Sequence, residues 1–213
     1  MNEPAAPTVF LVDDDAAVLK SLSRLIRSAQ LNVATFSSPR EFLARHDPAA
    51  PGCLVLDMAM PGLNGLELQE RLAAKGHALP VIFLTGHGDI PMSVQAMKRG
   101  AVDFFTKPVS EENLLKAVRA ALERDRVDRA ARAEVGIIRA RLDTLTPREL
   151  EVFTHVIAGK LNKQIAGDLG TAEKTIKVHR GRVVEKLQVR SVAELVRLAE
   201  KAGIASAPPF SGA

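Results

Sequence analysis

Five short apolar segments separated by helical patterns occupy the first half of the chain and limit what it can fold into. Helical patterns follow each segment, at about 16–29, 38–46, 64–75, 91–99 and 110–123. The apolar segments are TVFLV, LNVATF, CLVL, PVIFLT and DFFT, at residues 8–12, 31–36, 53–56, 80–85 and 103–106. Strands alternating with helices are typical of a parallel sheet covered on both faces. We therefore predict a five-stranded parallel α/β fold with right-handed connections.

The second half reads as a long helix followed by a small all-α domain. From Glu111 onward the helical pattern meets no proline until Pro147, and its only glycine is Gly136. Thr146, Pro147 and Glu149 then form a helix-start signal, with Thr as N-cap, Pro at the first position and Glu completing a capping box. Four short helices are predicted, at about 147–157, 162–169, 172–187 and 191–201.

These patterns divide the chain into four parts. The first domain is predicted at residues 1–123, a helical linker at 124–142, the all-α domain at 143–203 and a disordered tail at 204–213. Five apolar linker residues are spaced 4, 3, 4 and 3 apart: Ala131, Val135, Ile138, Leu142 and Leu145. Two heptads are too few to establish a coiled coil. The stripe fits either a dimer seam or packing against the chain's own domains.

Charge and cysteine content limit the partners and the cellular compartment that the chain suits. The first 125 residues carry 13 basic and 15 acidic side chains, whereas residues 143–213 carry 11 and 8, so the two halves suit different partners. Cys53 is the only cysteine, which excludes an internal disulfide and agrees with a reducing cytoplasm. We recognise no signal peptide and no apolar run near the 20 residues of a membrane span. The chain has no Trp or Tyr, which argues against a single-strand reader built on aromatic stacking.

Acidic residues follow two of the predicted strands. Asp13 and Asp14 come just after the first strand, and Asp57 ends the third. If these strands are neighbours, the three carboxylates meet at one edge of the sheet, where ligands of doubly wound folds bind. Like charges this close repel, and a hard cation such as Mg²⁺ relieves the repulsion. A cationic side chain would add to that compensation at Asp57.

Two other strand ends supply groups suited to phosphoryl chemistry. Thr85 ends the fourth strand and offers a hydroxyl donor, while Lys107 follows the fifth and offers a point charge. Asp57 itself is a candidate nucleophile, because carboxylates form acyl phosphates. Each residue alone is more simply a turn or surface residue; their combination at four strand ends is specific.

In that order, these residues resemble the receiver domain of two-component response regulators, over about residues 7–123. The resemblance implies a flavodoxin-like sheet of order 2-1-3-4-5 and phosphorylation of Asp57 by a sensor histidine kinase. It implies Mg²⁺ held by Asp13, Asp14, Asp57 and the backbone carbonyl of Ala59. Lys107 would bridge to the phosphoryl group, preceding a cis bond to Pro108. Thr85 and Phe104 would form the switch pair, although core packing alone also explains Phe104, and His87 receives no catalytic role.

Residues 143–203 resemble a LuxR-type helix-turn-helix domain, through LTPRE, GKLNKQIA and TIKVHR. Together with GHGDIPMSVQAMKRGAVDF, this is similar to the FixJ-like branch. Independently, Ile176, Val183 and Leu187 fall on one helical face and basic residues fall elsewhere, a pattern that suits a major-groove helix and that a solvated surface alone also explains. The resemblance implies base contacts by Lys177 and Val178, with guanine favoured by the lysine. The full predicted DNA-contact set is Asn162, Lys174, Thr175, Lys177, Val178, Arg182 and Lys186.

Two residues depart from this resemblance. Ala172 stands where a Ser or Thr usually caps the recognition helix, a loss of about 1 kcal/mol unless Thr171 takes over. Gly181 stands where a basic contact is common. These departures affect which residues read the bases.

The two resemblances therefore imply a DNA-binding transcription regulator that phosphorylation turns into a homodimer, and not an enzyme. Two alternatives remain. One is an Mg²⁺-dependent phosphohydrolase, which would need a general acid near Asp57 where the sequence has Ala59. The other is a module whose second domain binds RNA or protein.

Overall fold

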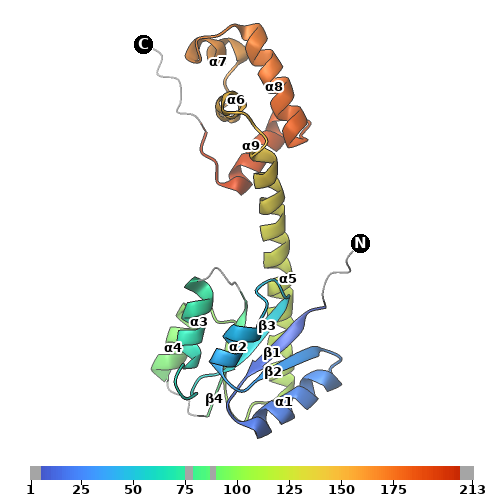
Figure 1. Cartoon of the computed structure of the whole chain (residues 1–213), viewed down its shortest axis with the longest axis vertical. Coiled ribbons are helices and arrows are strands. Elements are labelled where there is room, and N and C mark those ends of the chain that lie inside the picture. Colours follow the sequence, from blue (N-terminus) through green and yellow to red (C-terminus); the bar gives the residue numbers. More distant parts are fainter. Residues whose placement is uncertain (1–5, 75–78, 87–89, 207–213) are drawn as a thin grey trace. The chain divides into compact units, whose positions relative to one another are not determined.

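The computed structural model describes residues 6–74, 79–86 and 90–206 and divides the chain into two units, Met1–Arg129 and Ala130–Ala213. Figure 1 shows a sheet with its helices in the first unit and a group of helices in the second. The division falls inside α5 (Glu111–Leu142), within the segment predicted as the linker. None of the helices in the described parts of the chain is both long and apolar enough to span a membrane.

The first unit holds the predicted parallel sheet, in the order β2-β1-β3-β4-β5. All four neighbouring pairs are parallel, and β1 lies between β2 and β3. The strands are β1 (Thr8–Val12), β2 (Asn32–Phe36), β3 (Gly52–Asp57), β4 (Val81–Thr85) and β5 (Asp103–Thr106). β1 and β3 are therefore neighbours, as convergence of the carboxylates requires.

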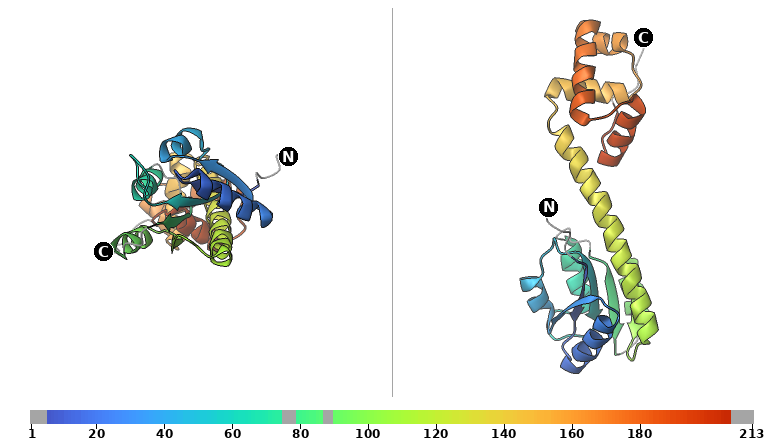
Figure 2. Two further views of the ribbon diagram at one scale, coloured as in Figure 1. Left: turned by 90° about the horizontal axis from the view of Figure 1, so that it is seen from below. Right: turned by 90° about the vertical axis from the view of Figure 1, so that its right-hand side faces the viewer.

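Helices cover both faces of this sheet, as Figures 1 and 2 show. One core joins the strands to α1 and α5 through residues such as Ile26 and Leu114, and the other joins them to α2 and α3 through Phe42 and Leu68. These helices are α1 (Ala16–Ser28), α2 (Pro39–Arg45), α3 (Gly65–Ala74) and α4 (Ile90–Lys98). Cys53 is fully buried in the first of these cores, as predicted.

The second unit contains the four predicted helices, α6 (Pro147–Ile157), α7 (Asn162–Asp168), α8 (Glu173–Leu187) and α9 (Val192–Ala202). α6 starts with the predicted capping box, in which Glu149 N–H donates to Thr146 Oγ1 and Thr146 N–H donates to Glu149 Oε2. The core of the unit includes Phe153, Ile165, Ile176 and Leu195.

The linker stripe packs partly inside this second unit. Ile138 is 8% exposed and belongs to its core, and Leu142 and Leu145 pack against that core. Ala131 is exposed and Val135 is half-buried. Three of the five stripe residues therefore have partners within their own unit, which favours internal packing over a dimer seam at those positions.

Candidate phosphoacceptor site and nucleic-acid interface

The three acidic side chains come together at the carboxyl ends of β1 and β3. One ligand oxygen from each of Asp13, Asp14 and Asp57 lies within 4.8 Å of the others. Asp13 and Asp57 are buried, at 3% and 5% exposure, while Asp14 is exposed. The sheet order places them here because β1 and β3 are parallel neighbours that end at the same edge. The expected convergence is therefore what the fold produces.

Local hydrogen bonds fix the turn after β1. Asp13 Oδ1 accepts a hydrogen bond from the backbone N–H of Asp15 at 2.9 Å. Asp15 then caps α1 by accepting from the N–H groups of Ala17 and Val18 at 2.7 and 3.3 Å. The run of three aspartates thus divides its work: Asp15 starts the helix, and Asp13 and Asp14 remain at the site.

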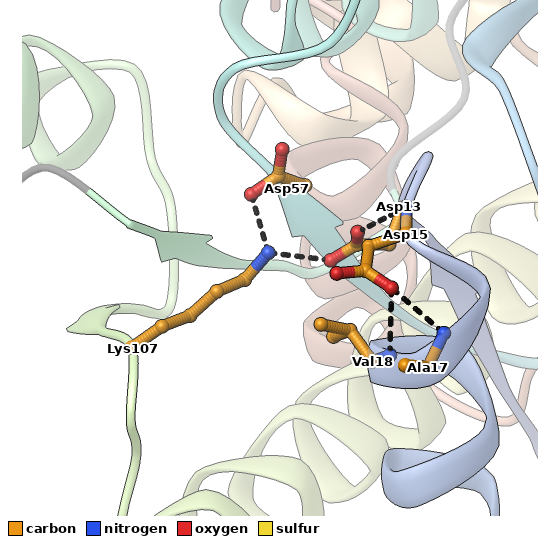
Figure 3. Close-up of polar contacts among 6 residues, drawn as sticks. All are labelled: Asp13, Asp15, Ala17, Val18, Asp57 and Lys107. Carbon is orange, nitrogen blue, oxygen red and sulfur yellow. Dashed lines mark hydrogen bonds and ion pairs between the residues drawn. The ribbon is translucent and has the colours of Figure 1, made fainter.

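Lys107 joins the two buried carboxylates, as Figure 3 shows. Its Nζ lies 2.6 Å from Asp13 Oδ2 and 2.8 Å from Asp57 Oδ1. The side chain comes from just beyond β5, and the Lys107–Pro108 bond is cis. The strand-end carboxylate is thus compensated by a cation supplied from the far edge of the sheet.

The electrostatics of this group follow from burial and pairing. Burial raises the pKa of the Asp57 carboxyl, and its hydrogen bond to Lys107 offsets only part of that rise. Burial alone would lower the pKa of the Lys107 ammonium, but hydrogen bonds to Asp13 and Asp57 hold that pKa above its ordinary value. Any further positive charge at the site would therefore stabilise the ionised carboxylate of Asp57.

The donor set suits a hard divalent cation. All three side chains offer carboxylate oxygens, and Asp14 faces solvent, so water molecules can complete the coordination. Mg²⁺ prefers few carboxylates and several waters or phosphate oxygens. Ala59 is exposed two residues after Asp57 and offers only its backbone carbonyl, consistent with the predicted role.

Thr85 and Phe104 lie on neighbouring strands beside this site. Thr85 ends β4 and is 1% exposed, and its carbonyl accepts from the Lys107 N–H at 2.7 Å. Phe104 lies on β5 opposite Phe83 and is half-buried, with the two ring centroids 6.5 Å apart. This arrangement fits a switch pair and fits core packing equally. His87 lies outside the described residues.

In the second unit, α8 presents the predicted division between an apolar and a basic face. Ile176, Val183 and Leu187 are at most 1% exposed. The other face carries most of the predicted DNA contacts, and these side chains are exposed: Lys174, Thr175, Lys177, Val178 and Arg182. A helix buried on one side and basic on the other suits insertion into the major groove.

The two remaining predicted DNA contacts already have protein partners. Asn162 Oδ1 accepts from Arg180 Nη1 at 2.9 Å, which ties α7 to α8. Lys186 Nζ donates to Glu149 Oε2 at 2.6 Å and to the Thr144 carbonyl at 2.9 Å. Glu149 is 2% exposed, so Lys186 neutralises a buried carboxylate. Each side chain keeps hydrogen-bonding capacity for DNA but also holds the fold.

Sequence reasoning missed these partners. Arg180 lies 18 residues from Asn162, and Glu149 lies 37 residues from Lys186, so no helical spacing links them.

The start of α8 matches one expectation and corrects another. Ala172 is the N-cap residue, as expected, but α8 has no side-chain cap hydrogen bond, so Thr171 does not replace the missing cap.

Two family models match the chain. The model described as "Response regulator receiver domain" matches residues 9–119, and that described as "Bacterial regulatory proteins, luxR family" matches residues 143–199. The relatives include Nodulation protein W of Bradyrhizobium diazoefficiens, which is 48% identical over 93% of this chain and 87% of its own length. Response regulator protein TmoT of Ectopseudomonas mendocina is 46% identical over 94% of this chain and 91% of its own. The family is therefore one of DNA-binding transcriptional regulators.

Solved structures agree with these sequence matches. The response regulator StyR is 49% identical and superposes with a TM-score of 0.82 over 92% of this chain and all of its own. Full-length FixJ from B. japonicum is 39% identical and gives a TM-score of 0.56 over 93% of this chain and 98% of its own. The likeness extends over both units of the chain.

Proposed function

The chain belongs to the response regulators that join a receiver domain to a LuxR-type DNA-binding domain, and from this premise we propose that phosphorylation of Asp57 controls its binding to DNA. It is a transcriptional response regulator, similar to FixJ and TmoT. The observation that carries the proposal is the bridge from Lys107 to Asp13 and Asp57 at the edge where β1 and β3 end. The phosphodonor would be a sensor histidine kinase.

The chemistry is a transfer of a phosphoryl group to a carboxylate. An oxygen of Asp57 attacks phosphorus on the kinase's phosphohistidine, an O–P bond forms, and the N–P bond breaks with its electron pair leaving on the imidazole. Mg²⁺ held by Asp13, Asp14, Asp57 and the Ala59 carbonyl would neutralise part of the charge of the incoming group. Lys107 Nζ lies 2.8 Å from Asp57 Oδ1, so its ammonium is close enough to contact an oxygen of a phosphoryl group attached to Asp57.

The added group changes the charge next to Thr85 and Phe104. A phosphoryl group carries about −1.5 to −2 charges, so a hydroxyl donor such as Thr85 is attracted toward it. Space vacated by Thr85 would then be open to the half-buried Phe104 ring. Val94 and Met97, each 46% exposed on α4, offer an apolar face for a second copy once β4, β5 and α5 adjust. A two-fold pair would bring two recognition helices to half-sites about one DNA turn apart.

DNA recognition would rest on the exposed face of α8. Lys177 and Val178 would reach base edges, and Lys174, Thr175 and Arg182 would contact the backbone. Asn162 and Lys186 would add phosphate contacts with the donors that their protein partners leave free. Binding should weaken steeply with salt, because lysine and arginine release counterions from DNA.

Light-scattering mass, measured with and without Mg²⁺ and the phosphoryl mimic beryllofluoride, tests this proposal. We expect the mass of the wild-type chain to double on addition and that of Asp57→Asn to stay constant. DNA affinity should rise in parallel in the wild type only. An Asp57→Asn variant that dimerises and binds DNA on addition would show that the response does not pass through Asp57.

A further inference from the structure

Another buried carboxylate lies at the other end of β3 from Asp57. Asp125, on α5, is 2% exposed. Its Oδ2 accepts hydrogen bonds from the backbone N–H of Gly52 at 2.8 Å and from Arg129 Nε at 2.7 Å. A buried charge requires partners of this kind, and the proposed phosphotransfer does not use this carboxylate. Its role must therefore be sought in what it joins.

Arg129 extends the same contact to the loop before β3. Its Nη1 donates to the Ala49 carbonyl at 2.9 Å, and its Nη2 donates to the Ala50 carbonyl. The planar fork of an arginine fixes direction as well as charge. We call these contacts of Asp125 and Arg129 with Ala49, Ala50 and Gly52 the helix clasp.

The loop that the clasp holds has little freedom of its own. The Pro51 carbonyl accepts from the Thr8 N–H of β1 at 3.0 Å. A Cβ at Gly52 would lie 2.0 Å from the Thr8 carbonyl oxygen, so only glycine permits this approach of the two strands. The clasp therefore attaches α5 to a rigid point of the sheet.

That point is the start of the strand that ends in Asp57. β3 has six residues, all buried, and pairs with β1 on one side and β4 on the other. An extended strand of this length spans about 20 Å and does not stretch. A displacement of β3 at Asp57 is therefore transmitted along the strand to the clasp.

The clasp also marks where α5 leaves the receiver unit. The last fully buried α5 residue of the sheet core is Ala121, and Leu122 packs against that core. Beyond it, Asp125 and Arg129 hold the helix, and the unit ends at Arg129. Among the described contacts, the clasp therefore holds α5 to the receiver unit at the point where that unit ends.

We propose that Asp125 and Arg129 are positioning residues that couple the phosphorylation state of Asp57 to the linker helix and so to DNA binding. The inference rests on the proposed function of Asp57. With the clasp intact, the helix moves with β3 as one body. With it broken, these contacts no longer hold the helix beyond Leu122 to β3, and the receiver can be phosphorylated without changing the linker helix.

The test compares two pairs of the same spacing on the same helix. Asp125→Asn weakens the hydrogen bond from the Gly52 N–H and the pairing with Arg129, because a neutral amide oxygen accepts less strongly than a carboxylate, and Arg129→Gln removes the fork that holds Asp125 in place. Arg129→Lys keeps the charge without the fork and serves if Arg129→Gln fails to fold. The matched controls are Arg124→Gln and Asp128→Asn, an exposed pair with atoms 3.8 Å apart.

Three readouts are measured on the full chain: the phosphorylated fraction on a phosphate-affinity gel, the ratio of DNA affinities with and without beryllofluoride, and amide exchange at Gly52. We expect clasp variants to reach the same phosphorylated fraction as the wild type. Their ratio of DNA affinities should be at least fivefold smaller than that of the wild type, and the Gly52 amide should exchange faster. The double variant should lose no more than either single one, because both remove the same contact. Control variants should match the wild type.

Two results would overturn the inference, and they are distinguishable. Clasp variants that keep the wild-type ratio while Gly52 exchanges faster show that the clasp is merely structural. If the DNA affinity of the wild-type chain does not change on addition of beryllofluoride, both the proposed function and the coupling are wrong.

Discussion

Lys107 Nζ lies 2.8 Å from Asp57 Oδ1, so the proposed phosphoacceptor carries a cationic partner before any phosphoryl group arrives. The same ammonium lies 2.6 Å from Asp13 Oδ2. One cation therefore serves two buried carboxylates, with the exposed Asp14 beside them. This excess of negative charge makes the site sensitive to pH, to substitution and to divalent cations.

Asp57→Asn is expected to stabilise the folded chain at pH 7 in the absence of Mg²⁺. Burial raises the folded-state pKa of Asp57 above its unfolded value, so ionisation at neutral pH costs the folded state free energy. The gain corresponds to the free energy that this raised pKa represents. It should shrink as the pH falls through the folded-state pKa and vanish below the ordinary value, because Asp57 is then protonated in both states.

Calorimetry or circular dichroism gives this unfolding free energy, since the chain has no Trp or Tyr. Asp15→Asn is the matched control, because Asn caps a helix about as well as Asp. A variant less stable than the wild type at pH 7 would show that the pairing with Lys107 outweighs the burial of Asp57.

Lys107→Met is expected to destabilise the chain and to increase its response to Mg²⁺. The variant leaves Asp13 and Asp57, 3% and 5% exposed, without their cation. The cost should be about 1–3 kcal/mol without metal. Mg²⁺ should raise the melting temperature of the variant more than that of the wild type, because the ion replaces the missing charge. Equal shifts in both would place the ion elsewhere; exposed Lys116→Met is the control.

The sequence was sufficient to predict the sheet and the edge at which its carboxylates meet. Strand ends are local signals, so Asp13, Asp57, Thr85 and Lys107 could be assigned to them from patterns alone. The parallel order then places those ends together, as the carboxylate cluster and the Lys107 bridge confirm. The Thr146–Glu149 capping box was equally local and is confirmed.

Contacts between elements that lie far apart in the sequence could not be predicted in the same way. Helical spacing relates residues three or four apart, whereas the Asp125–Gly52 bond spans 73 positions and the Lys186–Glu149 pair 37. Lys186 matched a DNA-contact pattern because a lysine on a helix surface looks alike whether it faces phosphate or a buried carboxylate. Only the packed structure distinguishes these environments.

Lys186→Met and Lys177→Met are therefore expected to differ in their effect on stability. Lys186→Met leaves the buried Glu149 carboxylate without its cation and should cost about 1–3 kcal/mol of stability. Lys177 is exposed, so its substitution should leave stability unchanged and weaken specific DNA binding about tenfold, with relaxed preference for guanine. Calorimetry and a DNA-binding titration on both variants test this. Equal stability of the two would remove the structural role of Lys186.

Glu149 should make the second unit sensitive to acid. Its hydrogen bond to Lys186, and then that from the Thr146 N–H, hold the pKa of the Glu149 carboxyl below its ordinary value. Its contribution is therefore present above about pH 4.3 and is lost as the pH falls through the lower folded-state pKa. Glu149→Gln should be less stable than wild type at pH 7, with the gap narrowing in acid. Urea unfolding followed by circular dichroism measures both; a gap independent of pH would contradict the pairing.

Substitution of two adjacent isoleucines on α5 tests whether the linker stripe packs within its own unit or forms a dimer seam. Ile138 is 8% exposed and packs in the core of the second unit, whereas Ile137 is 56% exposed. Ile138→Ala should destabilise the second unit by about 2–5 kcal/mol through the lost transfer energy and the cavity, and Ile137→Ala should change stability by less than about 0.5 kcal/mol. Neither should alter the mass measured with beryllofluoride while the chain stays folded, because Ile138 is already used within its own unit. If Ile138→Ala kept its stability but abolished the doubling of mass, the stripe would be a dimer seam, and the internal packing of Ile138 would be secondary.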